Sequence, residues 1–244
     1  MLIDKHTRSL QNITFADGHL LLINKDKLWT SFDVVNKLRF MIRKAGNYKK
    51  IKVGHGGTLD PLATGLLLVG VGKETKNLQD YQNHIKEYIA DVHFGMETPS
   101  YDSETEPIAF YETAHITKKA IQDVLQEQFT GKILQKPPVY SAKTISGVRA
   151  YKSAREGKQV EMVPVPVEVY EHELLSFENN IARIRFVCSK GTYIRSLAYD
   201  IGKSLQSGAY LSDLIRTKSG GFSVDNSICV GEFEKLLQLS NTIV

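Results

Sequence analysis

The chain has 244 residues, 42% of them hydrophobic and 24% charged, with 31 lysines and arginines against 27 acidic residues. These values are typical of a globular protein with a sizeable core, and no apolar run approaches the roughly 20 residues of a membrane-spanning helix. Two cysteines exclude a disulfide framework or a cysteine-rich metal site, and the first residues lack the apolar stretch of a signal peptide. We therefore expect a cytoplasmic protein without membrane association.

The first third of the chain alternates between apolar runs and polar segments. Residues 19–24 (HLLLIN) predict a buried strand. Residues 31–44 predict an amphipathic helix with Ser31 as its N-cap. Residues 49–60 predict a loop rich in glycine and lysine, and the apolar residues 66–71 predict a central strand.

The middle of the chain predicts a strand and two helices with irregular segments between them. Residues 86–95 alternate between apolar and polar, as a half-buried strand does, and residues 96–110 are polar and loop-like. Residues 117–129 predict a helix. The double proline in residues 135–147 predicts an extended or irregular segment, and residues 148–156 predict a short helix.

The last third combines a hairpin with two helices. Residues 160–177 and 181–188 predict two strands joined by an Asn-Asn turn. Thr192 is the predicted cap of the helix that follows, residues 209–217 are ambiguous, and residues 232–239 predict a short final helix. Because the strands form antiparallel groups interrupted by helices, we expect an α+β fold. No linker divides the chain, which predicts a single domain over residues 1–244.

The sequence contains none of the common cofactor motifs. Its Gly-Lys pairs lack the remainder of a phosphate-binding loop, and the Gly-x-Gly at residues 54–56 does not continue as a dinucleotide fingerprint. Hydrolase elbows and zinc-protease motifs are also missing. We therefore expect no metal, no nucleotide and no organic cofactor.

Basic charge is concentrated in one stretch, residues 34–59, which contains no acidic residue. Such a block suits a polyanion, because each neutralised phosphate releases counterions. A solvated helix face followed by a lysine-rich loop explains the pattern equally well. Its basic side chains are Lys37, Arg39, Arg43, Lys44, Lys49, Lys50 and Lys52.

Two short segments place a charged residue close to glycine. In GHGGTLDPLATG (residues 54–65), glycines precede the carboxylate of Asp60 and would let a polynucleotide approach the backbone closely. Asp followed by Pro is also a common helix start, which would make Asp60 an N-cap. In CSKGTYIRS (residues 188–196), Arg195 falls in the first turn of a helix, where the helix dipole disfavours a cation. It could pair with a buried carboxylate or simply be an exposed arginine.

Two further features fit either RNA binding or ordinary structure. Tyr88 lies in the strand predicted at residues 86–95, so it is either a core aromatic or a ring that stacks on a base. Residues 135–151 combine the double proline with Lys143 and Arg149, which suits a loop that touches RNA but also an ordinary surface loop.

Taken in order, these segments resemble the bacterial TruB-type tRNA pseudouridine synthases over residues 18–224. The resemblance implies the pseudouridine synthase fold, with a mixed, largely antiparallel sheet flanked by helices and loops. The matching motifs are GHGGTLDPLATGLLLVGVGKETK, KEYIADVHFG, QKPPVYSAKTISGVRAYKSAREG, CSKGTYIRSLAYDIG and LSDLIRTKSGGF.

The resemblance also implies an activity, the isomerisation of uridine to pseudouridine at position 55 in the T-loop of tRNA. Asp60 would be the nucleophile on a flipped-out base, Arg195 its charge partner and Tyr88 the active-site tyrosine. The residues implied to contact the substrate are His55, Tyr193, Leu214 and Lys76. Contacts with the RNA backbone are expected from Lys37, Arg43, Lys49, Lys50, Lys52, Lys143 and Arg149.

The chain departs from the family pattern at three places. It has Lys25-Asp26 where the family usually has Lys-Pro, and Ile215-Arg216 where two arginines are common. About 20 residues follow residue 224, too few for the C-terminal PUA domain of many members, which predicts a short form without that domain. A monomer is the default expectation. The alternatives are a non-catalytic RNA-binding protein on the same scaffold, a synthase for another RNA and, more remotely, a structural protein.

Overall fold

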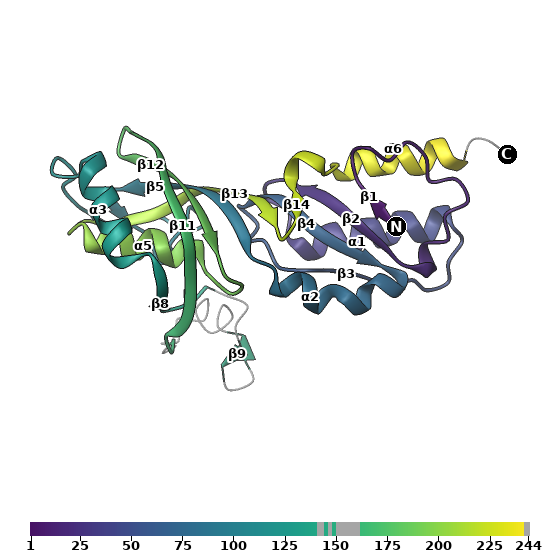
Figure 1. The fold of residues 1–244 in the computed structure, drawn as a ribbon, viewed down its shortest axis with the longest axis horizontal. Helices are drawn as coiled ribbons and strands as arrows, with labels where there is room; N and C mark the ends of the chain where they lie inside the picture. Colours follow the sequence, from purple (N-terminus) through teal and green to yellow (C-terminus); the bar gives the residue numbers. More distant parts are fainter. Residues whose placement is uncertain (141–143, 146–147, 150–161, 242–244) are drawn as a thin grey trace. The chain divides into compact units, whose positions relative to one another are not determined.

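The computed structural model describes residues 1–140, 144–145, 148–149 and 162–241, and the chain forms two compact units (Figure 1). The first unit comprises Met1–Tyr88 and Ile215–Val244, and the second comprises Ile89–Leu214. The chain leaves the first unit through strand β5 (Lys86–Phe94) and returns to it through strand β13 (Ala209–Ser219).

The sheet of the first unit is built on two paired apolar strands, β2 (His19–Lys25) and β4 (Thr64–Val71), which run antiparallel. They are buried on both faces, which explains why the sequence shows continuous apolar runs instead of alternation. The end of β13 pairs parallel with the start of β4, so that Arg216 lies opposite Gly65. Shorter strands complete this sheet: β1 (Leu2–Ile3), β3 (Val53–His55) and β14 (Phe222–Ser223).

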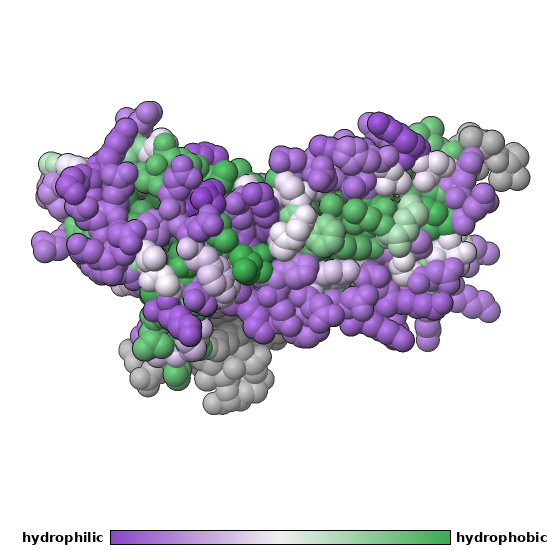
Figure 2. Space-filling model, in the orientation of Figure 1, coloured by the Kyte–Doolittle hydropathy of each residue, from purple (hydrophilic) through white to green (hydrophobic). Residues whose placement is uncertain are grey.

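Helices cover both faces of this sheet. On one face, α1 (Ser31–Ala45) and α6 (Val230–Asn241) enclose the larger core, with Phe233 completely buried. On the other face, Tyr81 of α2 (Leu78–Asn83) packs on a smaller cluster. The outer surface along α2 is hydrophilic (Figure 2). The smaller cluster consists of Leu20, Leu22, Leu66 and Leu68.

Helix α1 is capped one residue before the predicted position. The Thr30 hydroxyl accepts a hydrogen bond from the Asp33 N–H, and the Asp33 carboxylate accepts one from the Thr30 N–H, which makes a capping box. The prediction that Ser31 is the cap is wrong. Its hydroxyl instead donates to the Leu59 carbonyl at 3.0 Å and accepts from the Leu59 N–H at 2.8 Å.

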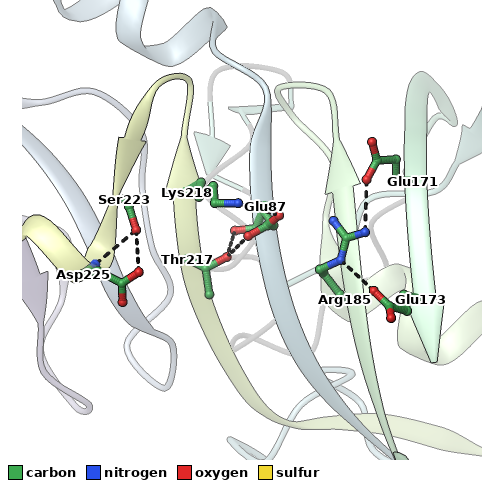
Figure 3. A network of polar contacts seen from close by, with 8 residues as sticks. All are labelled: Glu87, Glu171, Glu173, Arg185, Thr217, Lys218, Ser223 and Asp225. Carbon is green, nitrogen blue, oxygen red and sulfur yellow. Dashed lines mark hydrogen bonds and ion pairs between the residues drawn. The ribbon is translucent and has the colours of Figure 1, made fainter. Parts of the chain in front are cut away.

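The second unit contains the predicted hairpin, β11 (Val165–Glu178) and β12 (Ile181–Cys188). Asn179 and Asn180 form its turn with φ of +50° and +62°, a conformation that asparagine tolerates better than most residues. Arg185 of β12 bridges two glutamates of β11, at 3.1 and 3.2 Å (Figure 3). The strand order in this unit is β13-β5-β12-β11-β8, with β8 at Gly131–Gln135.

The described residues of the second unit include the helices α3 and α5. Thr117 caps α3 (Lys118–Gln128) through the Ala120 N–H, which confirms the predicted helix. Helix α5 (Ile194–Ser204) has Tyr193 at its N-cap, so the prediction that Thr192 caps it is wrong. The Thr192 hydroxyl instead donates to the Ser189 carbonyl at 2.9 Å.

Other differences from the predicted elements are local. The loop predicted at residues 96–110 contains the paired strands β6 (Met96–Glu97) and β7 (Ala109–Phe110). Of the helix predicted at residues 148–156, Val148–Arg149 form β10, paired with β9 (Thr144–Ile145), and the rest lies outside the described residues. Short 3-10 helices are Phe15–Asp17, Gly72–Asn77 and Val224–Asn226.

The strand pairing confirms the predicted fold class. β1 with β2 and β4 with β13 are parallel pairs, whereas β2 with β4, β3 with β4, β8 with β11 and β11 with β12 are antiparallel. The protein is therefore α+β, with a mixed and largely antiparallel sheet flanked by helices.

Candidate active site

Asp60 lies in the connection between β3 and β4 in the first unit. Its carbonyl accepts a hydrogen bond from the Ala63 N–H at 3.1 Å, which closes a turn, and β4 begins at the next residue. No helix starts here, so the alternative that Asp60 is a helix cap is wrong. Asp60 is half-buried. The turn therefore holds Asp60 immediately before the start of the buried strand β4.

The glycines before Asp60 make room for helix α2. A Cβ on Gly54 would lie 2.7 Å from the Leu78 side chain, and one on Gly56 would lie 2.5 Å from Tyr81 Cβ. Gly57 has φ of +134°, which L side chains rarely adopt. Packing at Gly56 and backbone conformation at Gly57 thus favour glycine, independently of any approach by a polynucleotide.

Ser31 fixes the residue next to Asp60. Its hydroxyl is bonded to both the N–H and the carbonyl of Leu59, whose side chain is also buried. Because both backbone groups of Leu59 are held by one side chain of α1, the loop has little freedom immediately before the carboxylate.

A buried lysine lies under the same turn. Lys25 is completely buried at the end of β2 and donates to the carbonyls of Trp29 (2.7 Å), Asp26 (2.9 Å) and Pro61 (3.3 Å). Burial lowers the pKa of Lys25 to about 8, and the negative charge of Asp60 opposes this shift. Lys25 therefore holds the turn while interacting electrostatically with the carboxylate.

A second buried cation, Arg216, holds the loop from β13. It is 2% exposed, and its guanidinium donates to the carbonyls of Leu66 (2.7 Å), Gly57 (3.1 Å) and Thr58 (3.3 Å). In the sequence, Arg216 was noted only because the chain has Ile215-Arg216 where the family often has two arginines. A cation within an apolar strand pattern is the feature that could have indicated a buried role for Arg216.

The other candidates of the first unit lie in three different elements. His55 is on β3, and its pKa is lowered by burial and by the charge of Arg216, so it is neutral at pH 7. Tyr88 is 9% exposed on β5, directly after Glu87, which accepts hydrogen bonds from Thr217 and Lys218 of β13 (Figure 3). Lys76 is exposed in the 3-10 helix after β4.

In the second unit, Arg195 is buried in the first turn of α5. It forms an ion pair with Asp102 at 3.5 Å and donates to the Ser100 carbonyl at 3.2 Å. Asp102 was not among the predicted site residues, because nothing in the polar segment around it distinguishes one carboxylate from another. The alternative that Arg195 is exposed is wrong. Its pairing with Asp60 stays a prediction.

Tyr193 and Leu214 also lie in the second unit. Gln135 is buried and clamps the backbone of Tyr193, accepting from its N–H at 2.8 Å and donating to its carbonyl at 3.0 Å. Leu214 is 7% exposed on β13. The buried Gln135 thereby fixes the start of α5, two residues before Arg195.

The predicted RNA-backbone residues are dispersed. Arg43, Lys49, Lys50 and Lys52 are exposed in the first unit, and Lys37 on α1 is half-buried. Arg149 lies in β10 and Lys143 lies outside the described residues.

In the part of the chain that the structure describes, no group of three or more His, Cys, Asp or Glu side chains could hold a metal ion. No helix among these residues is long and apolar enough to cross a membrane.

Similar solved structures identify the class of the fold. A chain of a Cbf5-Nop10-Gar1 complex superposes with a TM-score of 0.69 at 29% identity, over 96% of this chain and 58% of that one. A chain of an archaeal box H/ACA Nop10-Cbf5 complex has a TM-score of 0.65 at 25% identity, over 92% and 55%. This chain thus spans little more than half of their length, and its fold is that of the pseudouridine synthases.

Sequence comparison assigns the family. Residues 43–194 match the model described as TruB family pseudouridylate synthase (N terminal domain). Proteins called tRNA pseudouridine synthase B are similar throughout: 48% identity in Phocaeicola vulgatus, over 92% of this chain and 95% of that protein, and 47% in Flavobacterium johnsoniae, over 92% and 98%. The chain belongs to the TruB family of pseudouridylate synthases. It is an isomerase that converts uridine to pseudouridine.

Proposed function

We propose that this protein forms pseudouridine at position 55 in the T-loop of tRNA, with Asp60 as the nucleophile. The observation that carries the proposal is the near full-length similarity to proteins called tRNA pseudouridine synthase B, which includes the segment around Asp60. The rigid turn that holds Asp60 supports it, because a nucleophile acts best when its geometry is fixed before the substrate binds.

The proposed reaction exchanges one glycosidic bond for another. The N1–C1′ bond of uridine breaks, C1′ joins C5, the C5 proton leaves and N1 gains a proton, so the atoms and electrons balance without a cofactor. The base must leave its stack to reach the carboxylate, and we propose that the protein acts on a flipped-out uridine. Asp60 adds to the substrate and is released when the new bond has formed.

The other predicted residues have supporting roles in this proposal. Arg195 compensates the charge of Asp60 during the reaction, and Asp102 holds Arg195 in place. Tyr88 stacks on the uracil ring. A neutral His55 contacts the substrate without adding charge. Tyr193, Leu214 and Lys76 complete the substrate contacts.

The proposed RNA partner is the T-arm of tRNA. A folded stem-loop is recognised through its shape and its phosphates, which suits a basic surface more than a pattern of specific side chains. The residues assigned to the phosphates are Lys37, Arg43, Lys49, Lys50, Lys52, Lys143 and Arg149. A single-domain monomer that works in the cytoplasm remains a prediction.

The test is pseudouridine formation in an unmodified tRNA transcript, mapped to the nucleotide, for wild type and Asp60→Ala. Wild type should modify the T-loop uridine, and Asp60→Ala should lose product by at least about 10³-fold while retaining RNA binding. Asp80→Ala is the matched control, because Asp80 is an exposed carboxylate of α2 in the same unit.

Each contrary result selects a different explanation. A folded wild-type protein that binds tRNA without forming product would support the non-catalytic RNA-binding alternative. Product at another uridine, or in another RNA only, would replace the proposed substrate. Activity retained by Asp60→Ala would remove Asp60 as the nucleophile.

A further inference from the structure

Arg216 has the largest side chain among the completely buried residues of the described chain. Each of its three guanidinium nitrogens donates a hydrogen bond: Nε to the Leu66 carbonyl, Nη1 to the Thr58 carbonyl and Nη2 to the Gly57 carbonyl. Gly57 and Thr58 precede Asp60, and Leu66 follows it in β4. One guanidinium therefore connects the two backbone segments between which Asp60 is held.

The register of the sheet places Arg216 at this point. Arg216 pairs with Gly65 in the parallel ladder between β13 and β4. A Cβ on Gly65 would lie 2.4 Å from the Arg216 carbonyl oxygen, so the absence of a side chain at Gly65 lets the two backbones approach. The pairing of β13 with β4 thereby places the guanidinium of Arg216 within hydrogen-bonding distance of the carbonyls of the Asp60 loop.

Arginine is chemically suited to this position. Its planar fork presents several N–H groups in fixed directions, so it can bind adjacent carbonyls and a third acceptor at the same time, whereas the ammonium of lysine acts as a point charge. Burying a cation costs free energy, and neutral side chains could also form hydrogen bonds that connect the Asp60 loop to β4. The positive charge of Arg216 also acts on two neighbouring groups, because it helps to lower the pKa of His55 on β3 and of Lys25 on β2.

We propose that Arg216 is the positioning residue for Asp60. It fixes the backbone on both sides of the carboxylate and provides positive charge under the loop within the first unit. This inference rests on the proposed role of Asp60 as the nucleophile.

The experiment compares the kinetics of Arg216→Lys and Arg216→Met with wild type on unmodified tRNA transcript. Displacement of a reacting group by about 1 Å costs on the order of 10²-fold in rate, so Arg216→Met should lower kcat by about 100-fold and change KM by less than about threefold. Arg216→Lys keeps the charge but loses the fork, and kcat should fall by about tenfold. The affinity for tRNA should change little.

Two control variants separate positioning from general destabilisation. Arg185→Met removes an arginine with two carboxylate partners in the second unit, and kcat should stay within twofold of wild type. Leu38→Ala destabilises the core of the first unit without touching the loop. At a temperature where thermal melts show every variant folded, kcat of Leu38→Ala should also remain near the wild-type value.

The outcomes distinguish this inference from the proposed function. If Asp60→Asn is inactive while folded Arg216→Met and Arg216→Lys keep wild-type kcat, the positioning role is wrong and the nucleophile stands. If Leu38→Ala loses kcat as strongly as Arg216→Met, the effect is structural and the inference is also wrong. If Asp60→Asn retains full activity, the proposed function of Asp60 fails first. Should Arg216→Met not fold, the tenfold loss in Arg216→Lys decides.

Discussion

At the scale of single residues, the protein buries charge in two different ways. Arg195 forms an ion pair with the carboxylate of Asp102. Lys25 and Arg216 donate to backbone carbonyls instead: Arg216 to the loop before Asp60 and to β4, and Lys25 to Pro61 of the Asp60 turn and to Asp26 and Trp29 of the β2–α1 connection. Buried charges need such partners, because an uncompensated ion in the interior is strongly destabilising. The first arrangement stabilises a side chain and the second stabilises a backbone conformation.

Without the Asp102 carboxylate, the buried charge of Arg195 should destabilise the folded protein. Asp102→Asn should lower the free energy of unfolding by about 3 kcal/mol, because one partner of a buried pair is lost. Urea denaturation measures this difference. Asp123→Asn is the control, since its ion pair with Lys119 is exposed and should contribute less than about 1 kcal/mol. Equal effects of the two substitutions would contradict a significant role for the buried pair.

Lys25 should make stability depend on pH in the alkaline range. The pKa of Lys25 is about 8 in the folded chain and 10.5 in the unfolded one, so between these values the unfolded chain binds more protons. Stability attributable to Lys25 therefore rises with pH across this window, by about 2 kcal/mol between pH 8 and pH 10. Denaturant unfolding at both pH values measures the rise, and Lys25→Met should remove it. An identical pH dependence in Lys25→Met and wild type would refute the shift.

At the scale of elements, the close approach of β4 and β13 depends on one glycine. Gly65 has φ of +100°, and its position opposite Arg216 leaves no space for a side chain. Gly131 also has a positive φ, +77°, but nothing lies within 4 Å of where its Cβ would be. The two glycines therefore separate the cost of the backbone conformation from the cost of a steric clash.

Gly65→Ala should cost clearly more stability than Gly131→Ala. Backbone strain alone should lower the free energy of unfolding by about 1 kcal/mol in Gly131→Ala. The clash with the Arg216 backbone should raise the loss in Gly65→Ala to about 3 kcal/mol or more. Thermal and urea unfolding of both variants test this, and a loss at Gly65 no larger than at Gly131 would show that the strands separate without cost.

At the scale of the whole molecule, net charge is small but unevenly distributed. The formal charge is +4, and the segment between residues 34 and 59 has no acidic residue to offset its lysines and arginines. Most of these side chains are exposed in the structure. Exposed cations that bind phosphates show their contribution in the salt dependence of binding, because bound counterions are released.

The triple variant Lys49→Ala, Lys50→Ala and Lys52→Ala should therefore bind tRNA with a weaker dependence on salt. Each lost phosphate contact should reduce the slope of log K against log salt by about 0.7 to 0.9, which gives about 2 to 3 for the three lysines. The control is the same substitution at Lys118, Lys119 and Lys132, exposed lysines of the second unit. Equal slopes in the two triple variants would identify the basic segment as an ordinary solvated surface.

The sequence predicted the main apolar strands and the longer helices, but it missed the short strands and misplaced contacts made by polar side chains. Apolar runs and alternation located β2, β4, β5, the β11–β12 hairpin and the helices α1, α3 and α6, because burial imposes these periods locally. Ser31 and Thr192 were predicted to be caps, yet each bonds to backbone elsewhere. Residues 209–217 were ambiguous because β13 is buried unevenly along its length.

Sequence by itself determined the order of the main apolar strands and longer helices, the family motifs and the candidate residues Asp60, Arg195 and Tyr88, since these depend on local pattern. Only the tertiary structure decided which polar groups hold the site: Asp102 beside Arg195, Gln135 on Tyr193, and Lys25 and Arg216 under the Asp60 turn. The physical reason is that a buried charge or hydrogen bond depends on which distant segment supplies its partner. That partner is set by strand register and helix packing, and neither is encoded in the residues next to it.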